Sequence, residues 1–309
     1  MSAAAPDRAA ERVITVGLCT FRRPGVVATL ESLAAQALPA GTAVVVAVAD
    51  NDDTPSSEPL VRETAARLGL ALRYAHAPAR NISVARNAVL DAADTRWLAF
   101  LDDDELAAPD WVARLLAAAA DDGAAAAVFG PAVARYAPGS PDWAAACDFH
   151  SNRIPETEDA ILSGYTSNVL IDMDFVRRHG LRFRTELGRT GGEDTVFFHE
   201  MHRLGGALRY APDAAVFEDV QPGRVNLDWV WRRKYRSGQT HALLLEMRGQ
   251  TGARQKAIVA AKAAACFAMA AASALNRNRR LGWTARGLLH VGVLSRLSNR
   301  RLTVEYGEN

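Results

Sequence analysis

Short apolar runs alternate with segments of helical periodicity over the first 120 residues. Val26, Leu30 and Leu33 illustrate the helical period, because they fall on one face of their segment. Alternating strands and helices predict an α/β fold, a doubly wound and mainly parallel sheet with helices on both faces. The expected strands are 13–18, 44–48, 71–75 and 97–101, and the expected helices are 24–36, 58–68, 83–93 and 111–120.

Polar and charged residues follow three of these strands. The first strand leads into Thr20, Phe21 and Arg22, the second into Asp50 and Asn51, and the strand at 97–101 into three consecutive aspartates. The carboxyl ends of parallel strands meet at one edge of the sheet, where such folds bind their ligands. These residues are therefore expected to share one site.

The aspartates Asp102, Asp103 and Asp104 carry the strongest chemical signal. Adjacent carboxylates repel one another unless a cation compensates, and an all-oxygen cluster suits Mg²⁺ or Mn²⁺. The alternative, a solvated acidic turn, is favoured for Asp52 and Asp53. The sequence contains no G-x-x-x-x-G-K-[ST] motif and no G-x-G-x-x-G motif after the first strand. A divalent cation and arginine would then hold any phosphate groups.

The charge of the chain is divided unevenly. Residues 1–223 hold 20 Lys and Arg against 31 Asp and Glu, whereas residues 224–301 hold 16 against 2. A strongly basic C-terminal part suits a phosphorylated substrate or a membrane surface. It carries no zinc-finger, homeodomain or ribonucleoprotein signature, so no nucleic-acid partner is expected.

Five segments of the first 220 residues carry recognisable motifs. They are Ile14–Pro24, Val48–Asn51, Ser83–Asn87, Phe100–Asp104 and Gly191–Asp194. In their order and spacing they resemble the glycosyltransferase family 2 enzymes of the GT-A fold, over roughly residues 13–220. Trp229–Gly238 is similar to a segment of the bacterial succinoglycan-type branch.

This resemblance implies a nucleoside-diphosphate sugar as the donor. Asp50 and Asn51 would meet the base, Asp103 the ribose or sugar, and Asp104 with Asp102 would hold the divalent cation. A family histidine, which in some relatives binds the metal, is replaced here by Glu218, so a metal-binding role for that position stays open. The implied donor-binding residues are Thr20, Phe21, Arg22, Asp50, Asn51, Arg86, Asp102 and Asp103.

The resemblance also implies the catalytic groups. Asp194 would take the proton from the acceptor hydroxyl, with Glu193 beside it, and the sugar would be transferred in one displacement with inversion. From physics alone, a helix-capping role for the two acids is equally expected. Asn168 would lie at the acceptor pocket by resemblance, or cap a turn. The acceptor would be a glycan, a lipid-linked sugar or a natural product.

Arginines and aromatic residues interleave between 229 and 236. Arg236 is the best candidate for clamping the diphosphate, because guanidinium groups bind phosphate in bidentate fashion. A solvated basic helix is the alternative.

Residues 12–248 are expected to form the catalytic domain, preceded by a disordered tail at 1–11 that lacks the features of a signal peptide. Residues 249–309 should form a helical, basic extension. Its apolar helices either lie on the cytoplasmic face of the cell membrane or pack as a hairpin on the catalytic domain. The protein is accordingly expected in the cytoplasm, including the inner membrane surface.

Two other functions fit parts of this pattern. A nucleotidyltransferase would also use an acidic metal site, but it should offer a phosphate-binding loop after the first strand, and Thr20–Gly25 supplies this poorly. A catalytically silent, membrane-associated scaffold is the second alternative. Release of nucleoside diphosphate from sugar nucleotides would distinguish all three.

Overall fold

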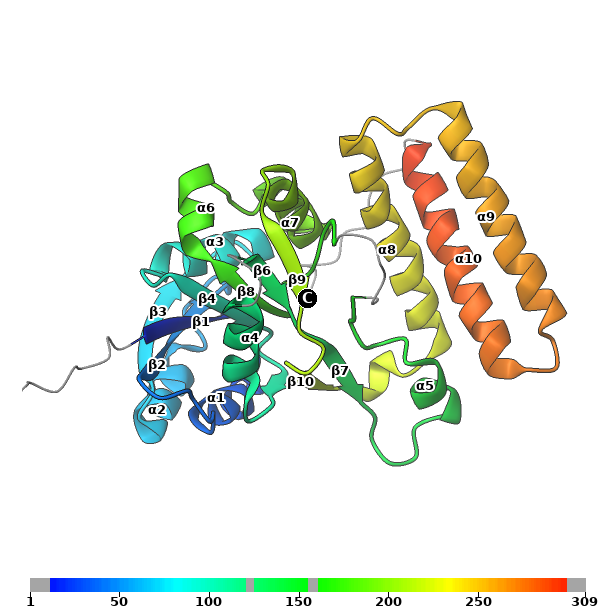
Figure 1. The fold of residues 1–309 in the computed structure, drawn as a ribbon. Coiled ribbons are helices and arrows are strands. Elements are labelled where there is room, and N and C mark those ends of the chain that lie inside the picture. The colour runs from blue at the N-terminus through cyan, green and yellow to red at the C-terminus, as the bar shows by residue number, and fades with distance from the viewer. Residues whose placement is uncertain (1–11, 121–124, 155–160, 299–309) are drawn as a thin grey trace, which may run out of the picture.

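The computed structural model describes residues 12–120, 125–154 and 161–298, so the expected disordered tail at 1–11 lies outside the described residues. A seven-stranded sheet forms the centre of the molecule, in the order β3-β2-β1-β4-β8-β6-β9 (Figure 1). A smaller sheet, β5-β10-β7, extends from one end of it. The large sheet consists of β1 (Arg12–Thr20), β2 (Thr42–Asp50), β3 (Ala71–His76), β4 (Trp97–Leu101), β6 (Ala125–Phe129), β8 (Asn168–Asp172) and β9 (Ala207–Tyr210); the small sheet consists of β5 (Glu105–Ala107), β7 (Ala132–Arg135) and β10 (Val216–Asp219).

The strands β3, β2, β1 and β4 run parallel, as the alternating pattern predicts. β8 is antiparallel to both of its neighbours, β4 and β6, and β6 and β9 are again parallel. The predicted doubly wound, mainly parallel α/β fold is therefore confirmed, with one reversed strand inside the sheet.

Helices cover both faces of the large sheet. One face packs against α1 (Val26–Ala34), α2 (Glu58–Leu68) and α4 (Trp111–Ala120). The other packs against α3 (Ile82–Ala92), α6 (Met173–His179) and α7 (Glu193–Arg203). The short helix α5 (Asp142–Cys147) lies near the small sheet, and 3₁₀ turns occupy Thr185–Leu187 and Pro222–Arg224.

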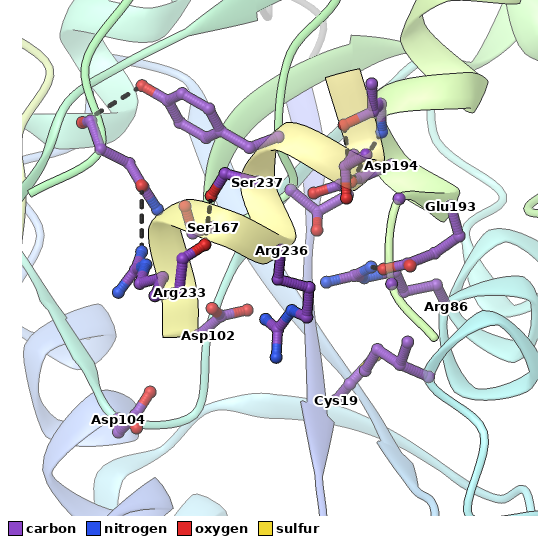
Figure 2. Close-up of a pocket in the computed structure, with 18 of the residues that line it drawn as sticks. Cys19, Arg86, Asp102, Asp104, Ser167, Glu193, Asp194, Arg233, Arg236 and Ser237 are labelled. Atoms are coloured by element: carbon purple, nitrogen blue, oxygen red, sulfur yellow. Dashed lines mark hydrogen bonds and ion pairs between the residues drawn. The ribbon is translucent and has the colours of Figure 1, made fainter. Parts of the chain in front are cut away.

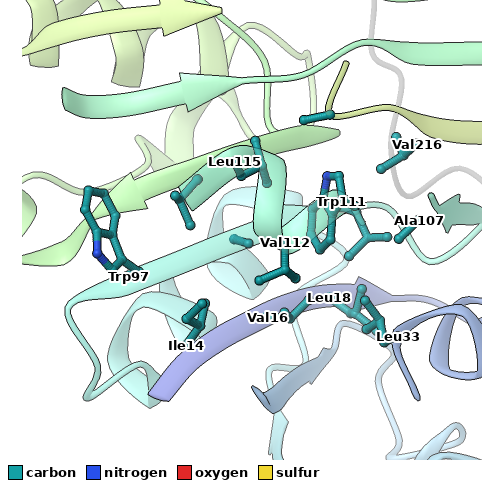
Figure 3. Packing of buried hydrophobic residues seen from close by; sticks show 14 of the residues in the cluster. Ile14, Val16, Leu18, Leu33, Trp97, Ala107, Trp111, Val112, Leu115 and Val216 are labelled. Atoms are coloured by element: carbon teal, nitrogen blue, oxygen red, sulfur yellow. The ribbon is translucent and has the colours of Figure 1, made fainter. Parts of the chain in front are cut away.

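The side chains of β1 alternate between the two faces of the sheet, so this strand contacts the helices on both faces. Ile14, Val16 and Leu18 all point into the first layer, where they join the apolar side chains of α4 (Figure 3). Gly17 faces the second layer, and a Cβ atom there would lie 2.4 Å from Cγ1 of Val89 on α3. The absence of a side chain thus lets α3 approach the strand closely.

Three long helices form a separate layer beside the sheets: α8 (Leu227–Met247), α9 (Ala253–Ala272) and α10 (Arg277–Leu297). α10 lies between α8 and α9 (Figure 1). Gly238 of α8 meets α10 where a Cβ atom would be 1.9 Å from the Leu289 carbonyl oxygen, and Gly292 is equally close to the Tyr235 carbonyl. The domain boundary expected at residue 248 lies between α8 and α9, within this three-helix layer. α8 packs along α10 and also against α7.

Candidate active site

A pocket of about 860 Å³ opens at the carboxyl ends of β1 and β4. The start of α7 forms another wall, and α8 closes the side opposite the sheet (Figure 2). Most of the residues that the sequence singles out line this one pocket. They are Thr20, Phe21, Asn51, Arg86, Asp102, Asp103, Asp104, Glu193, Asp194 and Arg236.

The three consecutive aspartates form an acidic loop in this pocket, and Arg23 is its main partner. Nη1 of Arg23 donates a hydrogen bond to Asp103 Oδ1 at 3.1 Å and also contacts Asp104 Oδ2. The second carboxylate oxygen of Asp103 is buried and has no hydrogen-bond partner. Burial therefore raises the pKa of Asp103 to about 7, although Arg23 opposes the shift. Arg23 belongs to the segment Ile14–Pro24, but its position in the sequence did not predict a role in the site.

Asp102 is half-buried beside Asp103. Burial raises its pKa, Arg86 opposes this rise, and the nearby Asp104 carboxylate adds to it. Excess negative charge of this kind favours a bound cation, and carboxylate oxygens are the ligands that Mg²⁺ and Mn²⁺ prefer. Over residues 12–120, 125–154 and 161–298 no group of three or more His, Cys, Asp or Glu side chains is arranged to hold a metal by itself. The acidic loop thus fits a cation in ligand type, with other coordination positions left for a ligand's oxygens.

Two glutamates, Glu105 of β5 and Glu218 of β10, lie opposite one another in the small sheet next to the acidic loop. Glu105 is buried, its Oε2 accepts a hydrogen bond of 2.8 Å from the Asp102 backbone N–H, and burial raises its pKa well above the usual range. Glu218 lines the pocket and accepts from Nη1 of Arg224 at 2.8 Å. Burial first, and then the Asp104 carboxylate, raise the pKa of Glu218. Glu105 directly follows the aspartates in the sequence, so its position was visible, but its burial was not.

A buried ion pair between Arg86 of α3 and Glu193 of α7 forms one wall (Figure 2). Burial disfavours the charge of Arg86, but Glu193 and two nearby aspartates outweigh this and raise the pKa of the guanidinium. Burial also raises the pKa of Glu193, because Arg86 compensates for only part of the lost hydration. Glu193 Oε2 is buried without a hydrogen-bond partner.

Asp194 occupies the first turn of α7, next to Glu193 but with a different environment. Gly191 and Gly192 precede it with φ of 81° and 94°, a left-handed conformation that favours glycine. The backbone N–H of Thr195 donates to Asp194 Oδ1 at 2.6 Å. Asp194 thus lies at the N-terminal end of α7, where the helix dipole is positive.

The wall formed by α8 is strongly basic. Arg236 projects into the middle of the pocket, between Asp102 and Arg86 (Figure 2). Nη2 of Arg233 donates to Asn152 Oδ1 at 3.2 Å, and its guanidinium lies 5.1 Å from the centre of the Trp229 ring. Arg232, Arg233 and Arg236 of α8 all line the pocket. Further lining residues to which sequence reasoning gave no role in the site are Cys19, Arg80, Ile82, Tyr165, Arg224 and His241.

Asp50 lies outside the lining of the pocket, contrary to the expected contact with a base. Its fully buried carboxylate accepts hydrogen bonds from the backbone N–H groups of Asp52 (3.0 Å) and Ser57 (2.8 Å) and from the Tyr74 hydroxyl (2.8 Å). Asp50 therefore fixes the loop that presents Asn51, because all its bonds are made within that loop and the neighbouring strand.

Arg22 is also absent from the lining. Its guanidinium binds Asp52 through two hydrogen bonds, Nε to Oδ2 at 2.8 Å and Nη2 to Oδ1 at 2.7 Å. The same group lies 5.1 Å from the ring centre of Phe21, which does line the pocket. Arg22 thus holds Phe21 and the β2 loop together at the rim.

Asn168 is a third correction, because it lies in the core and away from the pocket. Its Oδ1 accepts from Nε1 of Trp111 at 2.8 Å, and its Nδ2 donates to the carbonyls of Pro131 (2.9 Å) and Ala214 (2.7 Å). The residue is fully buried and ties β8 to α4 and to the strand connections. An acceptor could not reach this amide without displacing those bonds.

The mixed sheet with an acidic loop at its carboxyl edge defines a nucleotide-sugar glycosyltransferase of the GT-A type. The sequence model of glycosyl transferase family 2 matches residues 15–180. The chain is also 42% identical over 297 residues to the succinoglycan biosynthesis protein ExoM of Rhizobium meliloti, covering 95% of this chain and 96% of that protein. The chain therefore belongs to glycosyltransferase family 2, of the type that acts in exopolysaccharide biosynthesis.

Solved structures agree on the fold. The mannosyltransferase PcManGT from Pyrobaculum calidifontis, in complex with GDP-Man and Mn²⁺, superposes with a TM-score of 0.67 at 22% identity, over 97% of this chain and 91% of that one. Residues 1–349 of S. aureus TarS, in complex with UDP-GlcNAc, give 0.52 at 14% identity, over 96% and 97%. At these identities the superpositions establish a shared GT-A architecture.

Proposed function

We propose that this glycosyltransferase moves a sugar from a nucleoside-diphosphate sugar to an acceptor hydroxyl by a single displacement, with inversion at the anomeric carbon. The observation that carries the proposal is that Asp104 of the acidic loop and Asp194 of α7 line the same pocket. A leaving diphosphate and an incoming hydroxyl can therefore be handled in one space, as direct displacement requires.

The donor would lie along the sheet edge. Thr20, Phe21 and Asn51 line the part of the pocket next to β1 and β2, where the base and ribose fit. Arg236 projects between Asp102 and Arg86, so its guanidinium can pair with the diphosphate. The ligands of PcManGT and TarS support a nucleotide sugar as the donor class.

Asp104 and Asp102 would hold a divalent cation, Mg²⁺ or Mn²⁺, together with the diphosphate oxygens. When bound, this ion supplies positive charge that stabilises the nucleoside diphosphate as it leaves. Arg23 contacts Asp104 and so maintains charge balance in the acidic loop when the pocket contains no cation. The Mn²⁺ in the PcManGT complex supports this choice of ion.

Asp194 would act as the general base. The backbone N–H of Thr195 fixes one of its oxygens, and the group can accept the proton of the acceptor hydroxyl. Glu193 is tied to Arg86 and would position the turn that carries Asp194, since its own carboxylate is engaged and buried.

We also propose that the acceptor is reached at a membrane surface, through the C-terminal helices, which places the enzyme at the inner face of the cell membrane. α9 is, among the described residues, the one helix long and apolar enough to cross a bilayer, and 22% of its most apolar window is buried. A lipid-linked sugar would then be within reach of the pocket.

A panel of nucleotide sugars with Mn²⁺ tests the chemistry, with nucleoside-diphosphate release and the anomeric configuration of the product as readouts. We expect Asp194→Asn to lower kcat by about 10²–10⁴-fold while nucleotide binding is retained. Asp104→Asn should instead weaken Mn²⁺-dependent nucleotide binding. Asp213→Asn is the matched control, because Asp213 is a largely exposed acid outside the pocket lining. Turnover by Asp194→Asn at the wild-type rate, or retention of configuration, would overturn the proposal.

A further inference from the structure

Helix α9 lies at the outer edge of the three-helix layer. It packs along α10, which separates it from α8 (Figure 1). Its buried residues form a single narrow stripe, Val259, Ala263, Cys266 and Ala270. Their spacing of three or four residues corresponds to one helical face, so the rest of the circumference of α9 is open.

The open face of α9 is apolar. Ile258, Phe267 and Met269 are 40%, 39% and 42% exposed, and Leu275, just beyond the helix, is completely exposed. The positions between them are mainly exposed alanines, with Lys262 as the only charged side chain on the helix after Lys256. A continuous apolar surface of this kind marks an interaction site rather than ordinary surface.

Cations flank the apolar surface at both ends. Between residues 249 and 298 the chain has 8 Lys and Arg and no Asp or Glu. Arg254 and Lys256 stand in the first turn of α9, and Arg277, Arg279 and Arg280 are exposed at the start of α10. Apolar surface bordered by cations matches the acyl boundary and the phosphate headgroups of an anionic bilayer.

We propose that α9 lies in the plane of an anionic membrane, with its exposed alanine face towards the hydrocarbon and the flanking arginines on the lipid phosphates. Ile258 and Met269 border that face on one side, and Phe267 borders it on the other, against Gly287 of α10. This inference rests on the membrane contact proposed above, but it does not depend on the chemistry in the pocket. It specifies the contacting face, the orientation of the helix and the charge of the lipid.

The neighbours of α9 exclude a spanning orientation. α10 packs along α9 and carries Arg286, and its Arg296 pairs with Glu246 of α8 at 2.9 Å. If α9 crossed the bilayer, α10 and these charged groups would have to enter the hydrocarbon with it, which is costly. An in-plane helix keeps α8, α10 and the pocket in water.

Charge also disfavours a second copy of the chain as the occupant. Two α9 helices packed against one another would bring together the cations of both chains, with no acid between 249 and 298 to compensate. Anionic lipid supplies the opposite charge. The membrane is therefore the partner that satisfies both the apolar face and its basic borders.

Vesicle flotation of the full chain tests this orientation, with phosphatidylcholine vesicles and vesicles containing about 30% phosphatidylglycerol. Wild-type protein should bind the anionic vesicles at least tenfold better and should be released by alkaline carbonate. Ile258→Asp with Met269→Asp should reduce binding at least tenfold, because the two apolar side chains that share one border of the open face are lost. Arg279→Glu with Arg280→Glu should abolish the preference for anionic lipid.

Leu60→Asp is the matched control, since Leu60 is an equally exposed apolar residue on α2, which packs on the sheet far from α9 (Figure 1). It should bind vesicles like wild type. Circular dichroism and donor turnover in vesicle-free solution should be unchanged in every variant, which separates this test from that of the active site. Equal flotation of the Ile258/Met269 variant, resistance to carbonate, or a dimer in light scattering that this variant dissociates would each overturn the proposal.

Discussion

The guanidinium of Arg86 and the carboxylate of Glu193 form an ion pair that is almost completely removed from solvent, at the junction of α3 and α7. The two residues are 107 positions apart, so the pair fixes the start of α7 relative to the sheet. Since Asp194 is the next residue, its position depends on this pair.

Arg86→Met should destabilise the fold in a pH-dependent manner. Without its partner, the pKa of Glu193 rises above its already raised value, so the folded chain binds a proton that the unfolded chain releases. Stability is then retained at pH values below the ordinary glutamate pKa. It is lost as the pH rises through the raised pKa that Glu193 has in the folded variant. We expect a small loss at pH 5 and a loss of about 3–5 kcal/mol at pH 8, measured by urea unfolding.

The double variant Arg86→Met with Glu193→Leu is the control, because it removes both members of the pair, while Asp102 loses the nearby charge of Arg86 equally in the single and the double variant. It should recover most of the lost stability and show little difference between the two pH values. A single variant that loses the same stability at pH 5 and pH 8 would contradict this account of the pair.

Arg23→Gln should strengthen binding of Mn²⁺ by the nucleotide-free chain. Arg23 contacts the same carboxylate that the proposed cation needs, so the two compete for Asp104. A partly exposed ion pair is worth roughly 1 kcal/mol, so we expect about a fivefold lower Kd in Mn²⁺ titrations followed by electron paramagnetic resonance. Arg22→Gln, whose wild-type side chain pairs with Asp52 instead, should leave the Kd unchanged. Weaker Mn²⁺ binding in Arg23→Gln would rule out the competition.

Gly292→Ala should separate α8 from α10. The new methyl group would lie 1.9 Å from the Tyr235 carbonyl oxygen, and overpacking of this kind costs about 1–3 kcal/mol. Because Tyr235 precedes Arg236, nucleotide binding should weaken as well.

Gly282→Ala is the matched control on the same helix, with no atom within 4 Å of the added group. It should raise stability by up to about 1 kcal/mol through helix propensity. Equal effects of the two variants in calorimetry and nucleotide titration would contradict the close packing.

Asn168→Ala tests the corrected position of that residue. It leaves the Trp111 N–H and two backbone carbonyls without their buried partner, which should cost roughly 3 kcal/mol of folding free energy. KM for the acceptor should not change at a temperature where the variant is folded. A stable variant with a raised acceptor KM would restore the original expectation.

The fold could be predicted where local pattern determines the element. The segments 58–68, 97–101 and 111–120 form helix, strand and helix with the expected bounds, because their periodicity is regular and their ends carry turn residues. The direction of β8 could not be predicted in this way. The apolar run Val169–Ile171 is typical of a buried strand, but the neighbouring strands β4 and β6 determine its antiparallel pairing.

The rule that ligands bind at strand ends brings most of the candidate residues to one pocket, and tertiary contacts account for the exceptions. The Asp50 carboxylate is bound by Ser57 and by Tyr74 of β3, whereas the next residue, Asn51, lines the pocket. Asn168 is held by Trp111, 57 positions earlier, and no local pattern reveals that contact. Arg23 and Arg22 are neighbours of the same type, and only tertiary structure shows that Arg23 is the one in the pocket.

Helix α8 contributes one side to the pocket and another to α10, whereas α9 packs along α10 alone. The outermost helix can thus change its sequence without altering any group that meets the donor. Natural variation or engineering at α9 could redirect such an enzyme to another surface, or release it into solution, while its chemistry stays intact.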